Sequence, residues 1–131
     1  MEEAKPKVIY CALGNPKDLV DKVHDAGLLF MHQVHTAKQA REAADLGVDI
    51  IIAQGSEAGG FCSDVTSLAL IAQVVDAVKD RQIPVVAAGG IADGRGLAAG
   101  LILGAQGINI GTRFLDSVEA TLVELQWKQR G

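Results

Sequence analysis

Three glycine-rich segments hold the residue types and spacing that most clearly suggest chemistry. They read Gln-Gly-Ser-Glu-Ala-Gly-Gly-Phe-Cys at 54–62, Gly-Gly-Ile-Ala-Asp-Gly at 89–94 and Gly-Thr-Arg-Phe at 111–114. Glycine lets backbone N–H groups approach an anion closely, and a helix that begins just after it adds a favourable dipole. One glycine pair alone would fit a tight turn equally well. Three such segments, each after a short apolar run, predict a phosphate-binding site.

Histidines and cysteines are the remaining candidates for catalysis. His32 and His35 end the second apolar run, and each is either a site residue or a surface histidine. His24 falls in a predicted helix and is expected in solvent. Cys11 and Cys62 stand near the same rim with no base partner evident in the sequence, so a nucleophilic role is not expected. They form no CxxC pair, so neither a metal site nor a disulfide is indicated.

Two carboxylates in the glycine-rich segments are expected to support the structure. Glu57 either accepts backbone N–H bonds that orient its loop or pairs with a cation such as Arg113, and a structural role is favoured. Asp93 is expected to cap the helix that follows it, in preference to any catalytic role.

Alternating strands and helices must position these segments. Apolar runs predict strands at residues 8–13, 28–34, 48–53, 84–88 and 107–110. Helical patterns predict helices at 16–26, 36–46, 65–81 and 94–103. In the first of these helices, Asn15 is expected to be the N-cap and Pro16 the first helical residue. A final packing helix is expected within 116–131, with Val118, Leu122, Leu125 and Trp127 on one face. Gly27, Gly47 and Gly104 follow predicted helix ends, where a left-handed residue favours glycine.

This alternation indicates an α/β fold with a parallel sheet, in which ligands bind beyond the carboxyl ends of the strands. The (βα) units are of TIM-barrel size, but five strands are too few for an eight-stranded barrel of about 250 residues. We therefore expect one incomplete, barrel-like, phosphate-binding domain over residues 1–131. Its sheet either stays open or is completed by oligomerisation.

Composition narrows the class of protein. The chain has 131 residues, of which 49% are hydrophobic and 21% charged, which is enough apolar material for a core. A net charge of −4 argues against a nucleic-acid binder. There is no apolar run of about 18 residues and no export signal, so we expect no membrane partner and a cytoplasmic location.

Four segments together resemble the nitronate monooxygenase family, also called 2-nitropropane dioxygenase-like proteins, and the related flavin-dependent enoyl-acyl-carrier-protein reductases. They are residues 34–43, 47–60, 84–95 and 104–115. The most specific matches are Ala-Ala-Gly-Gly-Ile-Ala-Asp-Gly-Arg and Gln-Gly-x-Glu-Ala-Gly-Gly. The resemblance implies an FMN-binding TIM barrel, of which this chain corresponds to the part from about the fourth strand to the eighth.

The resemblance also implies a set of cofactor-binding residues. The FMN phosphate would lie on the backbone amides of Gly89, Gly90, Gly111 and Thr112, and Gln54, Gly59 and Gly60 would line the flavin. The absent N-terminal strands would normally contribute to the flavin and substrate pocket. The implied activity is oxidative denitrification of alkyl nitronates, an oxidoreductase reaction on a small molecule.

The sequence departs from the family pattern at one position. In the family a histidine credited with acid/base work follows Gln-Gly-x-Glu-Ala-Gly-Gly, and here that residue is Phe61. The catalytic residue is therefore unknown, with His32 and His35 as candidates, and we expect weak or lost activity. One alternative is a non-catalytic phosphate- or FMN-binding barrel fragment that acts through self-association. Another keeps the phosphate site for a smaller phosphorylated metabolite. A homo-oligomer is expected because an incomplete sheet leaves open edges.

Overall fold

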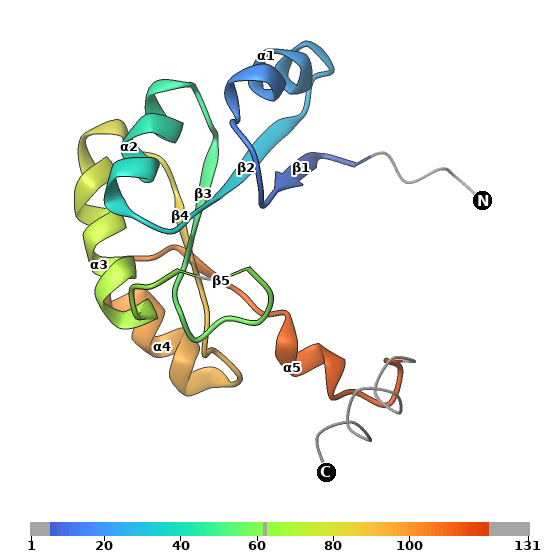
Figure 1. The fold of residues 1–131 in the computed structure, drawn as a ribbon, viewed down its shortest axis with the longest axis vertical. Coiled ribbons are helices and arrows are strands. Elements are labelled where there is room, and N and C mark those ends of the chain that lie inside the picture. The colour runs from blue at the N-terminus through green and yellow to red at the C-terminus, as the bar shows by residue number, and fades with distance from the viewer. Residues whose placement is uncertain (1–5, 62, 121–131) are drawn as a thin grey trace.

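The computed structural model describes residues 6–61 and 63–120, within which strands and helices alternate along the chain (Figure 1). The strands are β1 (Val8–Cys11), β2 (Leu29–Val34), β3 (Ile50–Gln54), β4 (Val85–Ala88) and β5 (Gly107–Asn109). The helices are α1 (Lys17–Asp25), α2 (Ala37–Asp45), α3 (Ser67–Val78), α4 (Gly94–Ile102) and the short α5 (Thr112–Leu115), with a 3₁₀ turn η1 (Lys79–Arg81) after α3. Among the described residues, no helix combines the length and apolar character needed to cross a bilayer.

The sheet has five parallel strands in the order β1-β2-β3-β4-β5. Sequential parallel strands joined by right-handed crossovers have their helices on one face, and α2, α3 and α4 stack along one side of the strands in Figure 1. This is the strand order of a barrel, whereas a doubly wound sheet reverses its order and has helices on both faces. The predicted parallel α/β fold with an open, incomplete sheet is confirmed, and β1 and β5 form its edges.

The main core lies between the sheet and the helices that cover it. Phe30, Ile51 and Val85 point from the strands into this layer and are almost fully buried, as are Leu70 and Val74 of α3. Side chains of a strand alternate between the two faces, so the neighbouring positions point away from the helices. On that second face, Val8, Tyr10 and Leu29 are exposed. The uncovered face is most exposed at the β1 edge.

Two details of the helices differ from the expectations. The first helix begins at Lys17, with Pro16 as its N-cap, because the Pro16 carbonyl accepts the N–H of Val20 at 3.0 Å. Asn15 still serves the helix start, since its Oδ1 accepts the Lys17 N–H at 3.0 Å.

The expected final helix is the second difference. The chain turns after α5, and Val118, expected to pack, is fully exposed. Leu122, Leu125 and Trp127 lie outside the described residues.

Candidate functional site

A large open cavity lies beyond the carboxyl ends of β3, β4 and β5. Its volume is about 1400 Å³. The lining contains every residue that the sequence assigned to a cofactor: Gln54, Gly59, Gly60, Gly89, Gly90, Gly111 and Thr112. Tyr10, Glu57, Asn109, Arg113 and Asp116 line it as well. Because the carboxyl ends of parallel strands meet at one edge of a sheet, the three glycine-rich segments surround a single space.

The glycine pair after β4 has a backbone that other residues rarely adopt. Its φ is +105° at Gly89 and +68° at Gly90. A Cβ on Gly89 would lie 2.5 Å from Ser67 Oγ, and one on Gly90 would lie 3.2 Å from Glu57 Cβ. The fold itself therefore requires these two glycines, whether or not a ligand binds beside them.

Gly111 differs, because no contact in the described structure demands glycine there. Its φ is −118°, which any residue adopts, and an added Cβ would meet no atom within 4 Å. Such a Cβ would enter open space at the cavity wall. The missing side chain leaves room for an anion to approach the backbone of Gly111 and Thr112.

Glu57 fastens the first glycine-rich segment to the start of α3. Its Oε2 accepts the Ser67 N–H at 2.7 Å, the Ser67 hydroxyl at 2.9 Å and the Ser56 hydroxyl at 3.2 Å. Burial alone would raise the pKa of Glu57, but the hydrogen bonds from Ser67 and Ser56 outweigh it and lower that pKa. The favoured structural role is confirmed, and Arg113 pairs with Asp116 instead, at 3.4 Å.

Ser67 was not identified from the sequence, although it joins the first glycine-rich segment to the end of β4. Besides its bonds to Glu57, its Oγ lies 3.3 Å from the Ala88 carbonyl oxygen. A serine at the start of a helical pattern is the signal for such a role, because hydroxyls at helix starts commonly bond nearby backbone and carboxylate groups.

Asp93 caps α4, as expected. Its Oδ1 accepts the Arg95 N–H at 2.9 Å, and its Oδ2 lies 2.6 Å from the Arg95 Nη2. These hydrogen bonds from Arg95 lower the pKa of Asp93. The carboxylate is thus committed to the helix start and to an exposed ion pair.

His35 lies just beyond β2, against the first glycine-rich segment. Its Nδ1 is 3.2 Å from the Gln54 carbonyl oxygen, and its ring meets the Phe61 ring edge-on with 5.4 Å between centroids. Gln54 Nε2 in turn donates to the carbonyl oxygens of Phe61 at 3.1 Å and Gly59 at 3.4 Å. The Ser63 hydroxyl donates to the His35 carbonyl at 2.9 Å. The ends of β2 and β3 and the loop between β3 and α3 therefore form one hydrogen-bonded unit.

The sequence matches the model of the nitronate monooxygenase family over residues 1–130. This chain belongs to that family. The nitronate monooxygenase of Neurospora crassa is 43% identical over 123 residues, which cover 89% of this chain and 32% of that protein. The chain spans about a third of the length of the curated relatives it matches.

Two solved structures of TIM-barrel proteins are similar to this chain in both fold and sequence. FabK from Thermotoga maritima superposes with a TM-score of 0.80 and 41% identity, over 86% of this chain and 35% of that one. A nitroalkane oxidase from Streptomyces ansochromogenes superposes with a TM-score of 0.71 and 36% identity, over 84% of this chain and 34% of that one. The resemblance seen in the sequence is confirmed.

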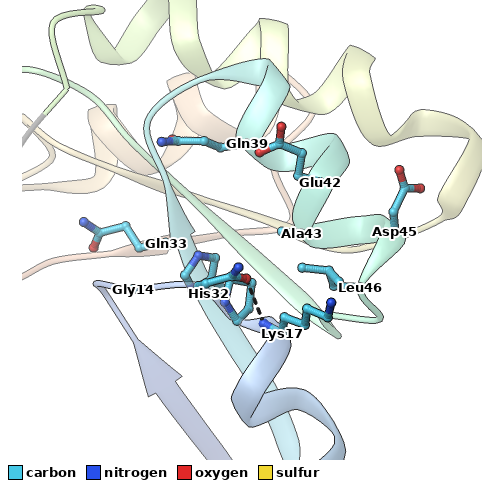
Figure 2. A pocket seen from close by; sticks show the side chains of 11 residues that line it. Gly14, Lys17, His32, Gln33, Gln39, Glu42, Ala43, Asp45 and Leu46 are labelled. Carbon is cyan, nitrogen blue, oxygen red and sulfur yellow. Dashed lines mark hydrogen bonds between the residues drawn. The ribbon is translucent and has the colours of Figure 1, made fainter.

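The two candidate histidines, His32 and His35, point to opposite faces of the sheet. They are three positions apart, and an odd separation along extended backbone reverses the side-chain direction. Figure 2 shows His32 with Lys17 and α2 residues around a second cavity of about 650 Å³, on the helix side. Burial lowers the pKa of His32, its ring stacks with Phe30 at 6.2 Å, and its Nδ1 has no hydrogen-bond partner among the described residues. Only His35 of this pair lies beside Phe61, the residue at which the sequence departs from the pattern that the resemblance implies.

His24 and Cys11 take no part in the contacts around His35 and Phe61. His24 Nε2 lies 2.8 Å from Asp49 Oδ2, so the side chain expected in solvent is partly exposed and paired. Cys11 Sγ contacts the Leu13 carbonyl at 2.9 Å, and Cys62 lies outside the described residues. Within residues 6–61 and 63–120, no cluster of three His, Cys, Asp or Glu side chains could hold a metal ion.

Proposed function

We propose that this chain binds FMN in the large cavity, with the phosphate on the backbone amides of Gly89, Gly90, Gly111 and Thr112. The observation that most supports this is the convergence of all seven sequence-assigned residues on one cavity of about 1400 Å³. The residues fit the group chemically, because Gly111 leaves a wall that a Cβ would fill, and Arg113 adds a positive charge. Gln54, Gly59 and Gly60 are proposed to line the flavin.

The proposed activity is that of a nitronate monooxygenase-like oxidoreductase, which removes nitrite oxidatively from alkyl nitronates. FMN, when bound, supplies the redox chemistry. The residues of the chain orient the flavin and substrate through Gln54 and the glycine-rich segments, as the family membership supports. We further propose one domain over residues 1–131, a cytoplasmic location and a homo-oligomeric assembly.

Phe61 limits this activity. A phenyl ring has no lone pair and no dissociable proton, so it can neither take a proton from a nitroalkane nor hydrogen-bond a nitronate oxygen. General acid/base catalysis is typically worth about 10²–10⁴-fold. We therefore propose weak or lost turnover of neutral nitroalkanes, with preformed nitronates affected least because they need no deprotonation.

The alternative is a non-catalytic phosphate- or FMN-binding barrel fragment that acts through self-association. The open sheet edges at β1 and β5 favour it. Visible absorbance and turnover together separate the proposals: a chain that carries oxidised flavin, or regains flavin absorbance after incubation with FMN and desalting, and that releases nitrite from an alkyl nitronate supports the oxidoreductase. A chain that stays colourless after incubation with FMN, or that binds FMN without turnover, supports the alternative.

A further inference from the structure

The large cavity has an aromatic side chain at one end and glycine-rich backbone at the other. Tyr10 is the one aromatic residue among the described residues that line it. Tyr10 belongs to β1, at one edge of the sheet, whereas the Gly89–Gly90 pair follows β4 and Gly111 follows β5, at the opposite edge. The cavity therefore offers a ring surface and an anion-binding surface to a single ligand.

The Tyr10 ring is held at its hydroxyl while the rest of the residue stays accessible. The hydroxyl donates to Gln33 Oε1 on the neighbouring strand β2, and Gln33 is itself fixed, since it is only 6% exposed. Burial is the main cause that raises the pKa of Tyr10, so the phenol keeps the donated proton at neutral pH. The residue is nevertheless 48% exposed. A ring that is already ordered binds a second ring with little further loss of conformational entropy.

The width of the sheet limits which ligands can touch both ends of the cavity. Tyr10 is three strand spacings from β4 and four from β5, which is roughly 14 to 19 Å along the sheet. A phosphate on the backbone of Gly111 cannot itself reach the Tyr10 ring. A ligand that contacts both must carry an extended linker between its phosphate and a ring. FMN has this form, because a ribityl chain joins its phosphate to the three-ring isoalloxazine.

We propose that Tyr10 is the stacking platform for the isoalloxazine ring and selects FMN over smaller phosphorylated ligands. The inference rests on the proposed function for its ligand, and it concerns the ring end of the same cavity. Tyr10 acts through binding alone, so no bond is made or broken by it. Val8 and Leu29 share its face of the sheet but lie at the amino ends of β1 and β2, outside the cavity lining.

Calorimetric titration with FMN, and separately with inorganic phosphate, tests the platform. Tyr10→Leu should weaken FMN binding about tenfold, because it removes the ring, and should leave the affinity for inorganic phosphate unchanged. Tyr10→Phe keeps the ring and should retain most of the FMN affinity. Leu29→Ala is the matched control: Leu29 is 47% exposed on the same face, so this variant should bind both ligands like the wild type and also reports any effect of altered self-association.

Flavin fluorescence reports the contact independently of affinity. A phenol stacked on an excited flavin quenches its emission by electron transfer, and a phenyl ring is much harder to oxidise. At saturating FMN, emission should therefore be weaker in the wild type than in Tyr10→Phe, which also keeps the test decisive if Tyr10→Leu fails to fold. Urea unfolding of each variant checks its stability.

The outcomes separate this inference from the proposed function. Unchanged FMN affinity in Tyr10→Leu, an equal loss in Leu29→Ala, or equal emission from the wild type and Tyr10→Phe would overturn the role of Tyr10. Binding of inorganic phosphate with no tighter binding of FMN would also overturn it, while leaving the phosphate site intact. Binding of neither ligand by the wild type would overturn both the proposed function and this inference.

Discussion

The Phe61 ring lies against His35, at the position where the resemblance to the family implies a histidine. The ring is 66% exposed and makes an edge contact, so the position tolerates a smaller, polar side chain without opening a core cavity. The loop around it is held by the Gln54 amide through main-chain oxygens, which do not depend on the side chain at 61. A substitution there should therefore alter chemistry more than stability.

Phe61→His should raise turnover of a neutral nitroalkane by the FMN-loaded chain about 10²-fold or more, because it returns a proton acceptor to the loop. Turnover of the preformed nitronate should change little. Steady-state rates for both substrates measure the difference, and Phe61→Leu serves as the control for loss of the ring. Equal rates for Phe61→His and Phe61→Leu on the nitroalkane would contradict this role.

Arg113 is the one basic side chain among the described residues that line the large cavity, and Asp116 partly neutralises it from 3.4 Å. Both side chains are more than half exposed, so their ion pair is weak and an anion can compete for Arg113. Asp116→Asn should tighten inorganic phosphate binding several-fold, and Arg113→Gln should weaken it. Titrations at low and high salt should show a larger difference at low salt, and an identical affinity in all three chains would contradict the role of Arg113.

Among single residues, the sequence predicted those whose role follows from their own backbone or from their immediate neighbours. Asp93 is an example, since its partner is two positions away. Ser67 was missed because its bonds reach from the start of α3 to Glu57 and to the end of β4. Tyr10 and Gln33, which are hydrogen-bonded to each other, were missed because their contact joins two strands. Such contacts depend on register, which a single sequence does not reveal.

Among the elements, α3 is joined to the first glycine-rich segment by the Glu57 carboxylate at its start. A carboxylate is favourable there because the N-terminal N–H groups and the helix dipole both attract it. The connection sets the distance between the loop after β3 and the end of β4, which Ser67 also contacts. The shape of the cavity therefore depends on the ionised form of Glu57.

Glu57→Gln should lower the free energy of unfolding by about 1 kcal/mol at neutral pH, a value reduced for the exposure of the carboxylate. The folded-state pKa of Glu57 lies below its ordinary value of 4.5, so its contribution is complete above 4.5 and is lost as the pH falls through the lower pKa. Urea unfolding of both chains at several pH values measures this. A difference that persists unchanged well below pH 4.5 would contradict the assignment.

The strands and helices were predicted well where local pattern decides them. Apolar β-branched runs gave all five strands, and Gly27, Gly47 and Gly104 follow helix ends with positive φ. The boundaries were less accurate: the helix expected over 65–81 ends at Val78, continues as η1 and stops at Gln82, whose φ is +55°. No residue type in that stretch signals such a left-handed stop, since glycine is the usual one.

For the whole molecule, the open sheet is the dominant feature. Strands β1 and β5 each leave one side unpaired within the described sheet, and Val8, Tyr10 and Leu29 are exposed beside the β1 edge. Exposed strand edges and apolar patches favour association. The strand count predicted this incomplete sheet, but nothing in one sequence specifies which surface covers it.

We predict that the chain forms a dimer or larger assembly through these surfaces. Val8→Lys should shift sedimentation toward the monomer, because a charged edge strand resists pairing. Ile102→Lys, on the outer helix layer where Ile102 is 85% exposed, is the control and should leave the assembly intact. A monomeric wild type at high micromolar concentration would contradict the prediction.

The large cavity is proposed to hold the FMN phosphate against Gly90, Gly111 and Thr112. Gly90→Val should also weaken binding by well over tenfold by placing a side chain at the anion, but its φ of +68° would strain any such variant. Gly111→Ala avoids this problem because its φ is ordinary and its Cβ enters open space. Gly94→Ala is the matched control, since its Cβ also meets nothing within 4 Å and Gly94 does not line the cavity.

Calorimetric titration of FMN into the wild type, Gly111→Ala and Gly94→Ala tests whether the phosphate lies beside Gly111. We expect the wild type and Gly94→Ala to bind FMN with equal affinity, and Gly111→Ala to bind it about tenfold or more weakly while remaining equally stable, because the new methyl group obstructs the phosphate. Equal FMN affinity in all three chains, or no binding by the wild type, would contradict the phosphate site at Gly111 and Thr112.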